Sequence, residues 1–128
     1  MLGEHGPVLA VITVGGALGS VARYGLNVAL PYSGGFPLPT FVENVAGCLL
    51  LGALLVVLTE LRRPHRLVRP FLGTGVLGGF TTFSTYAVDS VTRDNAGLAL
   101  AYVVLTLLAA LGATWAGITA ARRLGDAR

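Results

Sequence analysis

The sequence predicts an all-α integral membrane protein with four transmembrane helices. Of its 128 residues, 54% are hydrophobic and only 12% are charged, and the mean hydropathy is +0.75. A typical soluble domain carries about 25% charged residues. The apolar residues gather in four stretches, at about 8–30, 40–59, 70–88 and 96–120. Each is close to the ~20 residues that a helix needs to cross a bilayer. Because backbone polar groups in lipid must be satisfied within their own segment, each stretch is expected to be a helix of one transmembrane domain.

The first stretch, Val8–Leu30, is expected to be a retained helix rather than a cleaved signal peptide. Its leading end carries Glu4 and His5 in place of a basic cluster, and no A-x-A-like cleavage site follows. Arg23 lies near the far end of this stretch. An arginine there can snorkel to the membrane surface, or it can attract anions toward a vestibule.

The second stretch contains two adjacent polar residues, Glu43 and Asn44. Intramembrane polar residues are costly and usually face the interior of a helix bundle. The Asn44 amide offers two N–H donors, which suit an anion leaving water and equally suit a hydrogen bond to another helix. A carboxylate at Glu43 would repel an anion unless it is neutralised or turned away. Cys48, the single cysteine, is interpreted as a small packing residue.

The third stretch has an unusual composition, reading G-T-G-V-L-G-G-F-T-T-F-S-T-Y from Gly73 to Tyr86. Each glycine weakens helix continuity by about 1 kcal/mol relative to alanine. The adjacent pair Gly78 and Gly79 therefore predicts a break in the third helix. A break at membrane depth frees backbone carbonyls and amides, and broken helices often form ion sites. The same glycines are compatible with a groove for close helix packing.

Hydroxyl and aromatic side chains follow this glycine pair. Thr82 and Ser84 belong to a hydroxyl-rich run, and Phe83 and Tyr86 are three residues apart, so that their rings project from one helix face. The positive edge of an aromatic ring can face a small anion that has shed part of its water. Ordinary core packing explains the same rings equally well. The run is thus a candidate anion site with a plain structural alternative.

The fourth stretch carries polar side chains on one face. Tyr102, Thr106 and Thr114 are spaced at four and eight residues, and Ala110 fills the gap between the last two. This spacing is compatible with a polar rail along a pore. It is also compatible with hydroxyls that bond to their own backbone.

The charge pattern excludes two broad classes of function. The chain has nine arginines and no lysine, and the arginines flank the apolar stretches instead of forming the basic face of a soluble nucleic-acid-binding fold. No Ser/His/Asp set, paired carboxylates or phosphate loop is present in the sequence. We therefore expect neither nucleic-acid binding nor enzymatic activity.

Three strings in the sequence together resemble the Fluc/CrcB family of fluoride channels, and the resemblance covers nearly the whole chain. The family pattern G-G-x-x-G-A-x-x-R-Y is matched by Gly15, Gly16, Gly19, Arg23 and Tyr24, with Ser20 at the alanine. The pattern T-L-x-V-N-x-x-G is matched by Thr40, Asn44 and Gly47. The pattern G-G-x-T-T-F-S-T-F, the most specific of the three, is matched from Gly78 to Tyr86.

The resemblance implies an antiparallel dimer in the cell membrane, with two anion pores and a central structural sodium ion, through which fluoride leaves the cytoplasm passively. By motif position, the backbone carbonyls of Gly78 and Thr81 are expected to bind the sodium ion. The anion path is expected to be lined by Asn44, Phe83, Tyr86, Thr82, Ser84, Tyr102 and Thr106, with Arg23 in the vestibule.

The sequence departs from the family pattern at two positions, and two other functions are also compatible with it. Tyr86 replaces the second phenylalanine of the motif, and Glu43 replaces an apolar residue beside Asn44, which raises the question of whether both pores conduct. One alternative is a proton-coupled exporter of the small multidrug resistance type, although such a transporter needs a buried acid in its first helix. The other is a non-conducting accessory subunit held together by glycine packing.

The arginines also predict the topology of the chain. With four crossings, the amino terminus, the 60–69 loop and the carboxyl tail share one side of the membrane. That side holds Arg62, Arg63, Arg66, Arg69, Arg122, Arg123 and Arg128, whereas the other side holds Arg93 if the intrahelical Arg23 is left out. This strong bias predicts that both termini are cytoplasmic. An antiparallel dimer needs one subunit in the inverted orientation. We therefore favour a heterodimer, in which a homologous chain with the opposite arginine distribution supplies the inverted subunit. The alternative is a homodimer whose insertion tolerates the arginine bias.

A topology tag tests this prediction. When the chain is expressed alone with a reporter on its carboxyl terminus, we expect nearly all of the reporter in the cytoplasm, because arginines resist transfer across the membrane. A near-equal split between the two orientations, together with full fluoride flux, would contradict the heterodimer.

Overall fold

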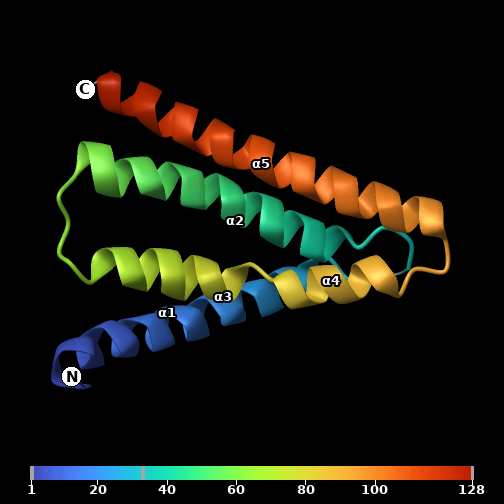
Figure 1. The fold of residues 1–128 in the computed structure, drawn as a ribbon, viewed down its shortest axis with the longest axis horizontal. Coiled ribbons are helices and arrows are strands. Elements are labelled where there is room, and N and C mark those ends of the chain that lie inside the picture. Colours follow the sequence, from blue (N-terminus) through green and yellow to red (C-terminus); the bar gives the residue numbers. More distant parts are fainter. Residues whose placement is uncertain (1, 33, 128) are drawn as a thin grey trace.

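The computed structural model describes residues 2–32 and 34–127, and within them every regular element is a helix (Figure 1). Helix α1 covers Leu2–Ala29. Helix α2 covers Leu38–Val56 and continues into the π-helical segment η1, Val57–Leu61. A second π-helical segment, η2, covers Pro70–Leu77 and is followed by α3, Gly78–Phe80, and α4, Phe83–Val91. The long helix α5, Ala96–Asp126, ends the fold.

Three helical segments are long and apolar enough to cross a membrane. They cover Gly3–Ala29, Leu38–Leu61 and Ala96–Asp126. These segments confirm the prediction of an all-helical, multi-pass membrane protein. The stretch predicted as the third crossing is not a single helix, because η2, α3 and α4 divide it.

The helix does not break at the glycine pair, so the predicted position is wrong. Gly78 is helical, with φ −63° and ψ −35°, and α3 contains both Gly78 and Gly79. The chain leaves the helical conformation at Thr81 (φ −79°, ψ 159°) and Thr82 (φ −145°, ψ 122°). Gly79 instead serves close packing, since a Cβ there would overlap the backbone carbonyl of Gly16 on α1.

Glycines set how the helices pair. Helix α1 packs along η2 and α3, and α2 packs along α5 (Figure 1). A Cβ on Gly19 would overlap the Val76 carbonyl of η2, and a Cβ on Gly117 would overlap the Leu49 carbonyl of α2. Small residues allow this close backbone approach in lipid, where no hydrophobic force drives helices together. The fold therefore consists of two closely packed pairs of helical segments.

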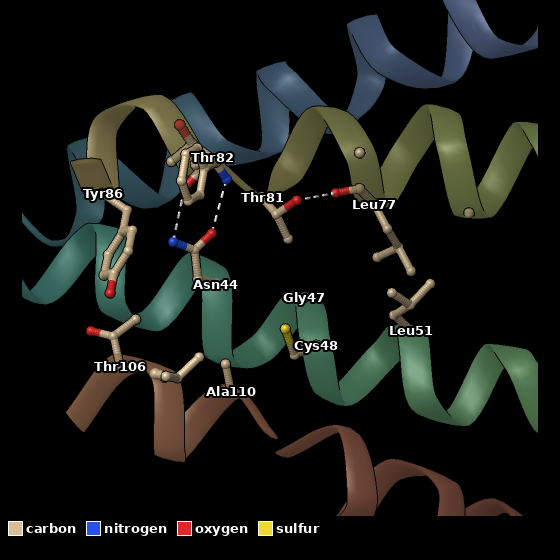
Figure 2. Close-up of a pocket in the computed structure, with 14 residues that line it drawn as sticks. Asn44, Gly47, Cys48, Leu51, Leu77, Thr81, Thr82, Tyr86, Thr106 and Ala110 are labelled. Carbon is tan, nitrogen blue, oxygen red and sulfur yellow. Dashed lines mark hydrogen bonds between the residues drawn. The ribbon is translucent and has the colours of Figure 1, made fainter. Parts of the chain in front are cut away.

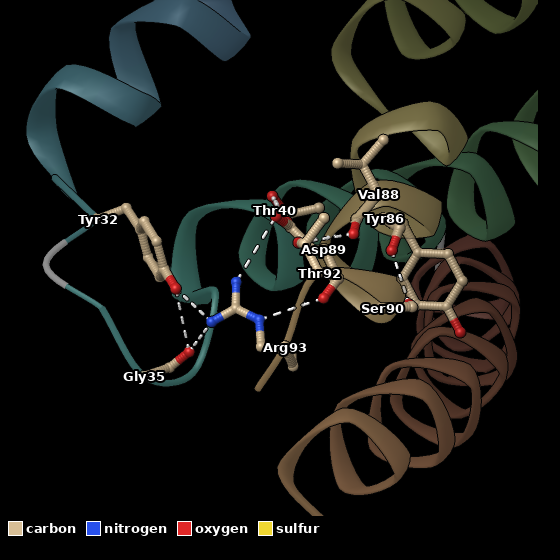
Figure 3. Close-up of polar contacts among 9 residues, drawn as sticks. All are labelled: Tyr32, Gly35, Thr40, Tyr86, Val88, Asp89, Ser90, Thr92 and Arg93. Atoms are coloured by element: carbon tan, nitrogen blue, oxygen red, sulfur yellow. Dashed lines mark hydrogen bonds and ion pairs between the residues drawn. The ribbon is translucent and has the colours of Figure 1, made fainter. Parts of the chain in front are cut away.

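Polar side chains stabilise both ends of the bundle. At the end where both termini lie, the Arg122 guanidinium makes a bidentate ion pair with Glu60, with N–O distances of 2.7 and 3.0 Å (Figure 1). At the opposite end, the Arg93 guanidinium bonds the Tyr32 hydroxyl and the Gly35 carbonyl, and its Nε donates to the Asp89 carbonyl at 3.1 Å (Figure 3). Arg93 thereby ties the loop after α1 to the end of α4.

Two glycines of α5 provide a test of the packing. Alanine at Gly117 forces α2 and α5 apart, and overpacking of this kind costs typically about 1–3 kcal/mol. Alanine at Gly112 meets no atom within 4 Å and should be neutral or slightly stabilising, because alanine is the better helix former. We expect Gly117→Ala to lower the thermal unfolding midpoint of the purified protein in detergent and Gly112→Ala to leave it unchanged or higher. Equal midpoints for the two variants would contradict this packing.

Candidate functional site

Asn44 bridges α2 to the interrupted segment between α3 and α4. Its Nδ2 donates to the Thr82 carbonyl at 3.0 Å, and its Oδ1 accepts from the Thr82 backbone N–H at 2.9 Å (Figure 2). The side chain thus pairs with the extended backbone of Thr82 as a neighbouring strand would. An amide group carries two N–H bonds, so the second N–H of Asn44 remains for another acceptor. Asn44 can therefore hold two helical segments together and still donate a hydrogen bond to an anion.

The hydroxyls of the interrupted segment act mainly on the local backbone. The Thr82 hydroxyl caps α4 by accepting from the Thr85 N–H at 3.2 Å, and the exposed Ser84 hydroxyl lies 3.4 Å from it. The Thr81 hydroxyl donates to the Leu77 carbonyl at 3.0 Å. Capping hydroxyls of this kind favour the start of a new helix where the previous one ends. Ser84 therefore supports the helix start, and it is not among the residues that line the cavity described below.

The aromatic rings of α4 differ in their surroundings. Phe83 is 80% exposed at the start of the helix. Its ring lies 6.1 Å from that of Tyr86, which in turn lies 5.3 Å from the ring of Tyr102 on α5. The Tyr86 hydroxyl donates to the Val103 carbonyl at 3.2 Å. The hydroxyl that distinguishes Tyr86 from the family phenylalanine is thus used to hold α4 against α5.

Two hydroxyls of α5 are buried without a partner. Tyr102 is 0% and Thr106 5% exposed, and neither hydroxyl finds a hydrogen-bond partner among the described residues. Buried polar groups are nearly always hydrogen-bonded in proteins, so orphaned ones point to a missing ligand, water or partner. Thr114, predicted on the same face, instead donates to the Ala110 carbonyl of its own helix at 3.0 Å. The polar face of α5 is therefore confined to Tyr102 and Thr106.

A cavity of about 380 Å³ brings most of these residues together (Figure 2). It lies between α2, the η2–α3 segment, α4 and α5. Seven of the predicted pathway or sodium residues border it, namely Asn44, Gly78, Thr81, Thr82, Phe83, Tyr86 and Thr106. The wall also includes Gly47, Cys48, Leu51, Leu77 and Ala110. Residues far apart in the sequence thus form one site. Tyr102 and Arg23 are not part of its wall.

Arg23, Asn27 and Glu43 form a separate polar group on the α1 side, in which Glu43 is the buried member. Glu43 is 1% exposed and accepts a hydrogen bond from the Asn27 amide, which also donates to the Arg23 carbonyl at 2.9 Å. Sequence reasoning missed Asn27, although its spacing of four residues from Arg23 places both on one helix face. Glu43 therefore points away from the cavity, and Asn27 satisfies part of its carboxylate.

The carbonyls of Gly78 and Thr81 fit a hard cation in their chemistry. The Thr82 N–H, which would bond the Gly78 carbonyl in a continuous helix, bonds Asn44 instead. The Thr81 carbonyl faces the Arg23 guanidinium at a long 3.5 Å. Carbonyl oxygens released from helical bonding are ligands of the kind that Na⁺ sites in broken helices use. Two carbonyls make only part of a coordination shell, so further ligands must come from outside this subunit or from water.

A further polar group near the Arg93 end was also missed. The Thr40 hydroxyl donates to the Asp89 carboxylate at 3.0 Å, and the guanidinium of Arg93, two residues beyond the end of α4, lies 3.6 Å from that carboxylate (Figure 3). The spacing of four residues between Asp89 and Arg93 was the sequence signal that could have revealed the ion pair. Together these contacts fix α4 against the start of α2, and hence the cavity wall.

The sequence is similar to a known family and to several curated proteins. Residues 10–118 match the family model described as "CrcB-like protein, Camphor Resistance (CrcB)". The chain is 54% identical over 122 residues to the fluoride-specific ion channel FluC 1 of Streptomyces coelicolor, covering 92% of this chain and 79% of the relative. It is 56% identical over 109 residues to FluC 2 of Streptomyces avermitilis, covering 80% and 69%. It is 46% identical over 117 residues to FluC of Paracoccus denitrificans, covering 88% and 93%.

Proposed function

Because the chain belongs to the CrcB-like family, we propose that it is a subunit of a fluoride-selective channel through which fluoride leaves the cytoplasm passively. The observation that carries this proposal is the cavity between α2, α4 and α5. It combines an amide with a remaining N–H donor, a buried hydroxyl without a partner and an exposed aromatic ring, from Asn44, Thr106 and Phe83 respectively.

The chemistry of these three groups suits fluoride. A selective pore must replace the hydration shell of the ion with protein contacts, each weak enough to release the ion again. Fluoride holds its water more tightly than the larger halides, so it needs strong, small donors such as amide N–H and hydroxyl groups. The positive ring edge of Phe83 adds a contact that does not bind cations. A chloride ion is larger and gains less from donors spaced for a smaller ion.

The remaining parts of the fold extend this proposal. The η2–α3 segment and α4 together form the third of four crossings, interrupted at Thr81 and Thr82, and two subunits pair in antiparallel orientation. Phe83, at 80% exposure, then meets the partner rather than lipid. The carbonyls of Gly78 and Thr81 bind the structural sodium ion with ligands from the partner. Tyr102 lines the anion path and Arg23 acts in its vestibule.

A heterodimer is supported by an observation on the relatives. Streptomyces avermitilis has relatives named FluC 2 and FluC 3, so one organism carries more than one such chain. A second chain supplies the inverted subunit that the arginine bias of this chain disfavours. Arg128, one of the arginines counted in that bias, lies outside the described residues.

The two alternative functions receive less support. A proton-coupled exporter needs a titratable acid on its transport path, whereas Glu43 contacts Asn27 and does not border the cavity. A non-conducting accessory subunit needs no path at all, and would leave the unpartnered hydroxyls of Tyr102 and Thr106 without a purpose.

A flux measurement with a matched variant tests the channel. In liposomes holding the assembled channel, purified together with its homologous partner subunit, we expect fluoride efflux at least about 100-fold faster than chloride efflux, a difference of ~2.7 kcal/mol. Phe83→Ile should cut fluoride efflux about tenfold, because a contact worth ~1.4 kcal/mol in the rate-limiting step is removed. The control is Trp115→Ile, since Trp115 is also an exposed ring, at 70%, but does not border the cavity. Equal fluoride and chloride rates would overturn the channel, and equal effects of the two variants would remove Phe83 from the path.

A second measurement tests the sodium ion. When sodium is rigorously replaced by N-methyl-D-glucamine, we expect loss of dimer and of flux, because the carbonyls of Gly78 and Thr81 then lose their shared cation. Readdition of sodium should restore both. Channels that stay assembled and fully active without sodium would show that these carbonyls do not bind it.

A further inference from the structure

A second cavity continues the first toward the end of the bundle that holds both termini. It has a volume of about 290 Å³ and lies between the α2–η1 segment and η2. Leu51 and Gly73 border both cavities. The other residues of its wall are Leu54, Leu55, Leu58, Arg69 and Thr74. The two cavities therefore adjoin along α2, and the space that they make up between Asn44 and Arg69 is called the groove.

Arg69 is the charged residue of this groove. It directly precedes Pro70, the first residue of η2, and its side chain is exposed. In the part of the chain that the structure describes, Arg69 has no carboxylate within 4.0 Å, whereas Arg122 at the same end of the bundle is paired with Glu60. The positive charge of Arg69 is thus not neutralised by a protein partner. Arg69 lies at the mouth of the groove, whose other wall residues are mostly leucines.

Apolar walls increase the reach of such a charge. A cleft lined by one sign of charge, with low-dielectric walls, focuses the field and raises the local concentration of the opposite ion. Leu54, Leu55 and Leu58 provide these walls here. An anion drawn to Arg69 is therefore directed along the groove toward Leu51, where the first cavity begins.

We propose that Arg69 is an anion-collecting residue, which concentrates small inorganic anions at the mouth of the groove and feeds them to the cavity that contains Asn44 and Thr106. This inference rests on the proposed channel function and adds to it a residue outside the family motifs. The neighbouring Arg62, Arg63 and Arg66 are exposed as well, but they do not border either cavity. The assignment is thus specific to one arginine of the 62–69 segment.

The phosphate of an anionic lipid shares the chemistry that Arg69 would recognise. A leucine-lined groove at the membrane surface also suits an acyl chain. The two sources of negative charge differ in one respect, since a lipid phosphate is present only in membranes that contain anionic lipid. Neutral phosphatidylcholine membranes therefore separate the two.

The experiment measures unitary fluoride currents of the assembled channel, purified together with its homologous partner subunit, in planar bilayers of neutral phosphatidylcholine. We expect Arg69→Gln to lower the current at least about threefold at ~10 mM ionic strength, within the range of electrostatic steering. The difference should vanish when an impermeant sodium salt raises the ionic strength to about 1 M, because the Debye length falls from about 30 Å to about 3 Å. Arg69→Lys should retain the wild-type current, since it keeps the charge. The matched control, Arg66→Gln, removes a charge from the same segment outside the groove and should change the current little.

A second variant covers the case in which Arg69→Gln does not fold. Thr74→Glu places a negative charge on the wall of the same groove, at an exposed position, and should lower the low-salt current in the same salt-dependent way. If Arg66→Gln lowers the current as much as Arg69→Gln, the steering comes from the general surface charge. If the loss of current in Arg69→Gln persists at about 1 M salt, it comes from altered packing and not from the charge. An effect seen only with anionic lipid would assign Arg69 to a lipid phosphate. Each of these results overturns the inference while the channel stands, whereas a wild-type protein without fluoride current overturns both.

Discussion

The structure depends on the hydrogen bonds that Asn44 makes with the backbone of Thr82. Thr82 has left the helical conformation, so its N–H no longer bonds the Gly78 carbonyl one turn earlier. A buried backbone donor without a partner costs about 1–3 kcal/mol. Asn44 accepts from this N–H at 2.9 Å and also donates to the Thr82 carbonyl at 3.0 Å. This bridge allows the segment from Pro70 to Val91 to be broken, and the break in turn places Phe83 and Tyr86 beside the cavity.

The glycine contacts explain why a cavity remains next to this bridge. Close backbone approach holds α1 to η2 and α3, and separately holds α2 to α5. No glycine brings the backbones of α2 and η2 into such close contact in the described residues, and the groove from Asn44 to Arg69 lies between these two segments. Packing in lipid is short-ranged, so the small residues decide which helices close together and which leave space between them.

The departures from the family pattern have local explanations. The Tyr86 hydroxyl bonds the Val103 carbonyl and leaves the ring near Tyr102. Glu43 bonds Asn27 on α1, away from the cavity, while the adjacent Asn44 faces the other way toward Thr82. Consecutive residues of a helix point about 100° apart, so an acid and an anion donor can be neighbours in sequence without sharing a site.

The sequence by itself determined the all-helical membrane class, the family and the residue types of the site. Hydropathy and spacing are local properties, and the Gly78–Tyr86 string is specific enough to be recognised without coordinates. Tertiary structure decided the position of the break. A glycine pair in the sequence does not reveal that Gly79 packs on Gly16, or that the Thr82 N–H bonds Asn44 from another helix. It also separated Thr106, whose hydroxyl is orphaned, from Thr114, whose hydroxyl bonds its own helix, although both lie on one predicted face. Whether a polar group is free depends on its neighbours from other helices, and these contacts between distant residues are not encoded in any local pattern.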